Sequence, residues 1–158
     1  MKLTTRGRYG LKALVDIAIT APPPETAADA SESKQYASIA YLAQQQGISE
    51  AYLEQIMGSL KRAGLVVTAR GAQGGYSLSR PAEEISVLDI LSVLEGTTLV
   101  DCVGTDGAEC ENVCICSARP LWLRLQNKIN AVLRETTLRD MADDYKKQIR
   151  RMNNEGIS

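Results

Sequence analysis

The sequence of 158 residues contains no histidine. That absence excludes acid–base catalysis by histidine and the Ser–His and Cys–His pairs that activate many enzyme nucleophiles. The sequence also lacks any uninterrupted apolar run near the roughly 20 residues that a membrane-spanning helix needs. The residues from Met1 to Arg6 have no apolar core of the kind found in secretory signals. We therefore expect a cytoplasmic protein that is not an enzyme and has no membrane partner.

Cysteine is absent outside one short segment, which holds all four: Cys102, Cys110, Cys114 and Cys116. In a reducing compartment, such a cluster indicates a metal or redox site before it indicates disulfides. No pair has the Cys-x-x-Cys spacing of many structural zinc sites. Thiolates suit iron–sulfur clusters and zinc equally well. An iron–sulfur cluster is the favoured interpretation, with zinc and a disulfide switch as the alternatives.

Charge is nearly balanced, because 18 Lys and Arg residues face 19 Asp and Glu residues. Residues 1–80 hold nine basic and six acidic side chains, whereas residues 81–158 hold nine and thirteen. A basic first half is what a phosphate-binding face needs, although this surplus is too small to carry that prediction alone.

Two short helices around a glycine are predicted between residues 38 and 64. Ser38 caps a helix that runs through Gln46, and Ser49 caps a second helix that ends before Gly64. Joined through Gly47, they form the helix-turn-helix pattern, which is also common in proteins that do not bind DNA. Four apolar side chains of the second helix share one face: Leu53, Ile56, Met57 and Leu60.

A β-hairpin is predicted directly after this pattern. Residues 65–70 and 76–80 have strand composition, and the glycine-rich segment from Gly71 to Gly75 joins them. Glycine lets the backbone approach another surface closely, and Arg70 at the tip can enter a minor groove. An ordinary tight hairpin is the alternative, but a helix-turn-helix followed by a basic hairpin is typical of a winged helix.

Further helices are predicted on both sides of this unit. A helix from Thr4 to about Ala21 ends at Pro22, and residues 25–35 are predicted to be a mobile loop. After the hairpin, Ser86 and Asp89 have the spacing of a capping box that opens a helix over residues 87–95.

The last two predicted helices cover residues 118–135 and the segment that follows a cap at Thr137. The first has an apolar stripe too wide for an exposed helix in so small a protein. It either covers the core of its own domain or, as we favour, packs against the same helix of a second chain in a homodimer. The stripe consists of Leu121, Trp122, Leu125, Ile129, Val132 and Leu133.

The predicted fold is mainly α-helical with a small β-hairpin wing, a winged helix-turn-helix followed by a long C-terminal dimerisation helix. We divide the chain into a DNA-binding domain at residues 1–82, a linker helix and cysteine loop at 83–117, and the dimerisation and C-terminal helices at 118–158.

The sequence resembles the Rrf2 family of winged-helix regulators over nearly its whole length. That family includes the iron–sulfur assembly regulator IscR, the nitric-oxide sensor NsrR and the iron-responsive regulator RirA. Three spaced cysteines followed by Leu121 and Trp122 resemble the family's cluster loop. The other segments that carry the resemblance are residues 1–10, 47–49, 52–55, 64–66, 70–71 and 74–76.

The resemblance implies roles for individual residues. Double-stranded DNA with a palindromic operator would be bound by Tyr52, Glu54, Gln55, Lys61, Arg70 and Gly71. Cys102, Cys110 and Cys116 would ligate a two-iron or four-iron cluster, and Trp122, Leu125, Ile129 and Val132 would form the dimer interface.

Three departures from the family pattern affect these roles. The proline-containing connection at residues 22–35 is longer than usual, and Ala51 replaces a serine of IscR, which implies a different DNA preference. Arg119 stands where IscR has a histidine ligand, and Arg8 stands where NsrR-like proteins have an acidic one. Cys114 is therefore the nearest candidate for the fourth ligand.

Cluster-dependent control of transcription is the function that the sequence predicts. A regulator of the same fold that uses thiol–disulfide or zinc chemistry is the first alternative, and an iron–sulfur carrier or redox protein is the second.

Overall fold

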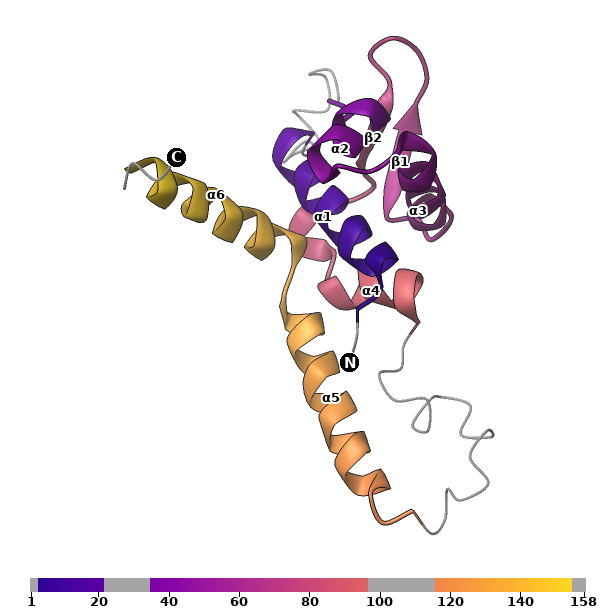
Figure 1. Cartoon of the computed structure of the whole chain (residues 1–158), viewed down its shortest axis with the longest axis vertical. Coiled ribbons are helices and arrows are strands. Elements are labelled where there is room, and N and C mark those ends of the chain that lie inside the picture. Colours follow the sequence, from indigo (N-terminus) through magenta and orange to yellow (C-terminus); the bar gives the residue numbers. More distant parts are fainter. Residues whose placement is uncertain (1–2, 22–34, 97–115, 155–158) are drawn as a thin grey trace.

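The computed structural model describes residues 3–21, 35–96 and 116–154. Figure 1 shows a helical domain with a two-stranded hairpin, from which α5 extends as a separate arm before α6 begins. The predicted mainly helical fold with one small antiparallel sheet is confirmed. The elements are α1 (Thr5–Thr20), α2 (Ile39–Gln46), α3 (Glu50–Arg62), β1 (Val66–Ala69), β2 (Gly75–Leu78), the 3₁₀ turn η2 (Ala82–Glu84), α4 (Val87–Glu95), α5 (Arg119–Glu135) and α6 (Leu138–Asn154).

Side-chain caps determine where the helices of the helix-turn-helix begin. The Ser38 hydroxyl accepts a hydrogen bond from the Tyr41 amide, and the Ser49 hydroxyl accepts one from the Tyr52 amide. Between them, Gly47 has a φ of 64°, a left-handed conformation that glycine adopts without strain. The boundaries predicted from these caps are therefore confirmed.

The strands are shifted from their predicted bounds of 65–70 and 76–80. β2 ends at Leu78 because the chain turns away beyond it, although the Ser79 amide still donates to the Leu65 carbonyl. Arg80, which was predicted to lie in the strand, instead donates to the Glu84 carbonyl and pairs with Asp89 of α4 at 3.4 Å.

Helix α1 lies in the middle of the core and packs closely on α4. A Cβ atom at Gly7 would collide with the Glu95 side chain, and one at Gly10 would collide with Leu94. The Glu95 carboxylate accepts hydrogen bonds from the backbone amide of Thr4 at 3.1 Å and from its hydroxyl at 2.5 Å. The last turn of α4 is thus tied to the beginning of α1.

A short antiparallel pairing joins the helical domain to the C-terminal helices. The Val87 amide donates to the Thr136 carbonyl, and the Leu138 amide donates to the Ile85 carbonyl, both at 2.9 Å. We call these segments, residues 85–87 and 136–138, the junction. Ile85 and Leu138 are fully buried there.

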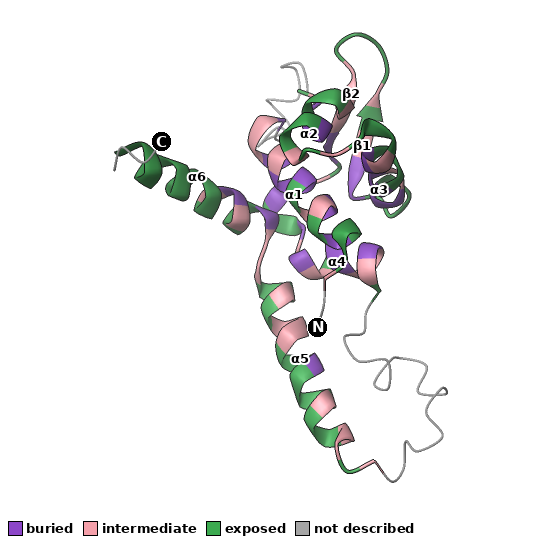
Figure 2. Ribbon diagram, viewed as in Figure 1, coloured by how far each residue is buried: buried purple, intermediate pink, exposed green. Residues whose placement is uncertain are grey.

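Helix α5 contributes no apolar side chain to the core. Among its residues only Gln126 is buried, and Figure 2 shows a helix that is mostly exposed or intermediate along its length. Within the described residues, the apolar stripe of this helix is therefore not part of the buried core, although α5 is in contact with α4. Within the described ranges, no helix has both the length and the hydropathy that crossing a membrane requires.

Replacing Leu138 should reveal how strongly the junction stabilises the fold. Because the side chain is fully buried, Leu138→Ala is expected to lower the free energy of unfolding by about 2–5 kcal/mol. The measurement is urea denaturation, with Arg139→Ala at the adjacent exposed position as the control. Equal midpoints for the two variants would contradict a structural role for the junction.

Candidate nucleic-acid interface

Helix α3 has one buried and one exposed face. Leu53, Ile56, Met57 and Leu60 are buried in the core, as their spacing predicted. The exposed face carries Glu54, Gln55 and Lys61 together with the neighbouring Glu50, Ala51 and Arg62. Three of the residues assigned to DNA from the sequence are thus accessible on one helix.

Tyr52 lies at the edge of this face and is only partly exposed. Its ring meets the ring of Tyr9 from α1 edge to face, with centroids 6.3 Å apart and planes at 88°. The ring also packs against the core. Tyr52 therefore holds α3 against α1, and only its remaining surface is available to a partner.

The base of the hairpin is fixed by contacts on two sides. The backbone of Tyr76 exchanges two hydrogen bonds of 2.8 Å with Ala37, the residue before the Ser38 cap of α2. A Cβ atom at Gly75 would collide with the Ala37 carbonyl, so only glycine permits this close approach. Buried Ser77 donates to the carbonyl of Ala21 at the end of α1. These contacts determine where the tip of the wing points.

The tip itself is exposed. Arg70 and Gly71 both lie at the surface, and Gly71 has a φ of 104° that other residues rarely adopt. The Gly74 amide donates to the Gly71 carbonyl at 3.0 Å and closes the turn. Figure 1 shows this turn projecting beyond the body of the domain.

The wing and α3 also interact electrostatically. Burial, and secondarily the Glu54 carboxylate, raise the pKa of Tyr76 in β2. The phenol is therefore a weaker acid than a free tyrosine, and at neutral pH it can donate a hydrogen bond.

Two arginines that sequence reasoning did not assign to DNA meet on the same serine. Arg6 of α1 and Arg62 of α3 donate from Nη2 to the Ser59 Oγ, at 2.6 and 3.1 Å. Neither is in an ion pair within the described part of the chain. Such paired guanidinium groups are suited to bind phosphate. In the sequence, the only sign of this role is that Arg62 follows Gln55 by seven residues, which places both side chains on the same face of α3.

Three of the four cysteines lie outside the described residues: Cys102, Cys110 and Cys114. Cys116 is a free thiol of intermediate exposure, and its carbonyl accepts a hydrogen bond from the Arg119 amide at the start of α5. Within residues 3–21, 35–96 and 116–154, no three potential metal ligands lie close together. The ligand set is therefore still a prediction.

The residues assigned to the dimer interface lie along the exposed arm. Leu125 is 43% exposed and Val132 is 61% exposed, whereas Trp122 and Ile129 are intermediate. In the described part of the chain, the exposed side of this stripe is an unusual exposure of apolar surface.

Comparison with known proteins agrees with this arrangement. The model of the Rrf2 family, described as iron-dependent transcriptional regulator, matches residues 3–144. IscR of Vibrio atlanticus is 33% identical over 91% of this chain and 76% of its own length, and protein rrf2 of Nitratidesulfovibrio vulgaris is 37% identical over 91% and 89%. The solved structure of CymR, described as the global cysteine regulator of B. subtilis, has a TM-score of 0.70 at 35% identity and covers 90% of this chain and 97% of that chain.

These similarities extend over the helix-turn-helix, the wing and most of the C-terminal part. The relatives are transcription regulators and not enzymes, as the sequence predicted. The chain belongs to the Rrf2 family of DNA-binding transcription regulators.

Proposed function

We propose that this regulator binds a palindromic operator as a homodimer, and that an iron–sulfur cluster in its cysteine loop controls operator affinity. The observation that supports the proposal is how the segments on either side of that loop are held. Glu95, at the end of α4, accepts hydrogen bonds from Thr4 at the beginning of α1. Cys116, on the other side, lies three residues before α5. A change in the loop acts on both helices at once.

A chain of contacts links the loop to the recognition helix. Glu95 holds Thr4, and two residues later Arg6 donates to Ser59 of α3. Displacement of the end of α4 would therefore shift the first turn of α1 and alter how Arg6 and Arg62 share the Ser59 hydroxyl. Because both arginines lie beside the exposed face of α3, such a shift changes phosphate contacts.

The donor set fits an iron–sulfur cluster. Cysteine thiolates are its usual protein ligands, and Cys116 is an unpaired, partly accessible thiol. Cys102, Cys110 and Cys116 would hold the cluster, which would supply a link sensitive to iron and oxidants. Arg119 cannot serve as the fourth ligand, because a guanidinium has no lone pair to offer. Cys114 is the proposed fourth ligand.

Thiol–disulfide control is a second candidate, and two observations favour it. Cys116 is a free thiol of intermediate exposure, and the chain is similar to a regulator described as the global cysteine regulator. Under this alternative, protein purified without oxygen holds neither iron nor sulfide, and oxidation alone changes operator binding.

Removing Arg70 should weaken operator binding without unfolding the protein. One specific groove contact contributes about 1–3 kcal/mol, so Arg70→Ala is expected to lose that much binding free energy. The measurement is fluorescence anisotropy at fixed salt, with a duplex selected from random sequences. Arg150→Ala, an exposed arginine of α6, is the matched control. Wild-type affinity for Arg70→Ala would exclude the wing tip from the interface.

The dimer is expected to depend on the apolar stripe of α5. Leu125→Asp would bury an unpaired charge between the two helices, which costs about 3–5 kcal/mol, and should yield monomers in light scattering. Asn127→Asp adds the same charge to the opposite face of the helix and should leave the dimer intact. A stable Leu125→Asp dimer would mean that another surface joins the chains.

The cluster ligands can be separated by paired substitutions in protein reconstituted without oxygen. Cys116→Ala should abolish bound iron, sulfide and visible absorbance, because it removes one of three required thiolates. Cys114→Ala should lower cluster yield and stability if Cys114 is the fourth ligand. Unchanged yield in Cys114→Ala would make that thiol a bystander, and unchanged iron in Cys116→Ala would exclude Cys116 as a ligand. Wild-type protein without iron and sulfide would contradict the cluster itself.

A further inference from the structure

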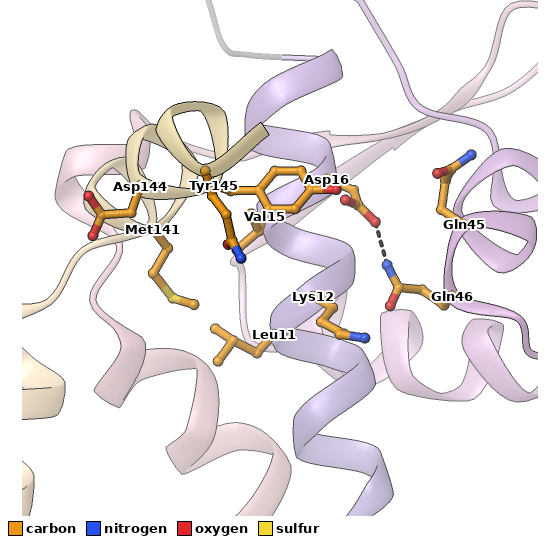
Figure 3. Close-up of a pocket in the computed structure, with 10 residues that line it drawn as sticks. Leu11, Lys12, Val15, Asp16, Gln45, Gln46, Met141, Asp144 and Tyr145 are labelled. Carbon is orange, nitrogen blue, oxygen red and sulfur yellow. Dashed lines mark hydrogen bonds between the residues drawn. The ribbon is translucent and has the colours of Figure 1, made fainter. Parts of the chain in front are cut away.

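A cavity of about 480 Å³ lies between α1, the end of α2 and the first turns of α6 (Figure 3). It involves none of the residues assigned to DNA, to the cysteine loop or to the dimer. Its volume falls in the range of roughly 300–1,000 Å³ that is typical of small-molecule sites. Nothing in the proposed function uses it.

One end of the cavity is polar and is lined by Asp16 and Gln46. The Gln46 Nε2 donates to the Asp16 carboxylate, and Figure 3 shows this pair at the side of α1 that faces α2. The other amide atom, the Gln46 Oε1, is shielded from solvent and accepts no hydrogen bond from the described part of the chain. Buried polar atoms without partners are rare in folded proteins and call for an explanation.

Asp16 shares this deficit. Burial raises its pKa, although the Gln46 amide and the positive charge of Lys12 act in the opposite direction. The carboxylate is therefore incompletely compensated. An ammonium group on a ligand would bring this carboxylate a positive charge and N–H donors.

The other end of the cavity is apolar. Leu11 and Val15 of α1 and Met141 of α6 line it, and Figure 3 shows Leu11 and Met141 approaching each other from the two helices. Leu11 and Met141 also pack against the core. An aliphatic body of a few carbon atoms would bury its surface here.

We propose that this cavity binds a small molecule that carries a primary ammonium group on an aliphatic body. The ammonium group donates to the Asp16 carboxylate, while the body lies against Leu11 and Met141. An alkylamine and a free aliphatic amino acid share this chemistry. Lys12, which also lines the cavity, supplies a counter-charge for the carboxylate of an amino acid.

The position of the cavity gives the ligand a regulatory consequence. Gln46 is the last residue of α2 in the helix-turn-helix, and Met141 lies in the first turns of the helix that follows α5. A ligand between them would connect the DNA-binding unit to the C-terminal helices. This consequence rests on the proposed function, whereas binding of the ligand does not.

Titration of the ¹⁵N-labelled full chain followed by NMR tests the proposal without DNA. The probes are L-leucine, 3-methylbutylamine, which lacks the carboxylate, and 4-methylpentanoate, which lacks the ammonium group. Saturable shifts at the Gln46 and Tyr145 amides are expected with leucine or the amine, and none with the acid. Binding of leucine alone identifies an amino-acid site, and equal binding of both identifies an amine site. Comparable shifts with the acid, or no saturable shift with leucine or the amine, would overturn the proposal.

Substitutions locate the site. Asp16→Asn preserves the size of the side chain and should weaken binding at least tenfold, whereas Asp143→Asn removes a charge from α6 outside the cavity and should have no effect. Met141→Lys places an ammonium group inside the cavity and should abolish binding, while Met141→Leu should retain it. The assignment would be overturned if Asp16→Asn and Asp143→Asn lost the same affinity, or if Met141→Lys and Met141→Leu did. If Asp16→Asn does not fold, the comparison of the two Met141 variants decides whether the ligand binds in this cavity.

Discussion

The junction between residues 85–87 and 136–138 orients the other functional parts. Its two backbone hydrogen bonds place the start of α4 beside the start of α6, and the buried Leu138 anchors the pairing in the core. Each start is closed by a capping box, Ser86 with Asp89 and Thr137 with Asp140. Because α5 ends at this point, its direction relative to α3 is set here. In the proposed dimer, that direction determines the spacing of the two recognition helices.

In the proposed function, the junction also determines how a change in the cysteine loop would act on the helices. The chain runs from α4 through the loop to α5 and on to the junction, where it pairs with the segment at the start of α4. Helices α4 and α5 also lie against each other. In the proposed function, a cluster that drew the loop together would pull on both of its flanks, of which one is tied through Glu95 to α1 and the other leads into α5. Binding in the loop would therefore be transmitted to the position of α5 against the DNA-binding unit. A coupling of about 1–3 kcal/mol is sufficient for regulation of this kind.

Local chemistry made much of the fold predictable. Ser38, Ser49 and Ser86 are strong caps, and Gly47 and Gly75 occupy positions where the backbone permits little else. Contacts between distant segments were not predictable from the chain. The convergence of Arg6 and Arg62 on Ser59 joins residues 53 positions apart, and the cavity forms where the first turns of α6 lie against α1. The residues assigned to DNA remain predictions, although five of the six are exposed on α3 or the wing.

The central claim is that a cluster in the loop controls operator affinity through α4 and α5. The most direct test measures operator affinity of one anaerobic preparation before and after removal of its cluster, at constant salt, with the oligomeric state checked in both forms. The account predicts a change of about tenfold in affinity while the protein remains folded and dimeric. An unchanged affinity, in protein shown to have held and then lost its iron and sulfide, would contradict it.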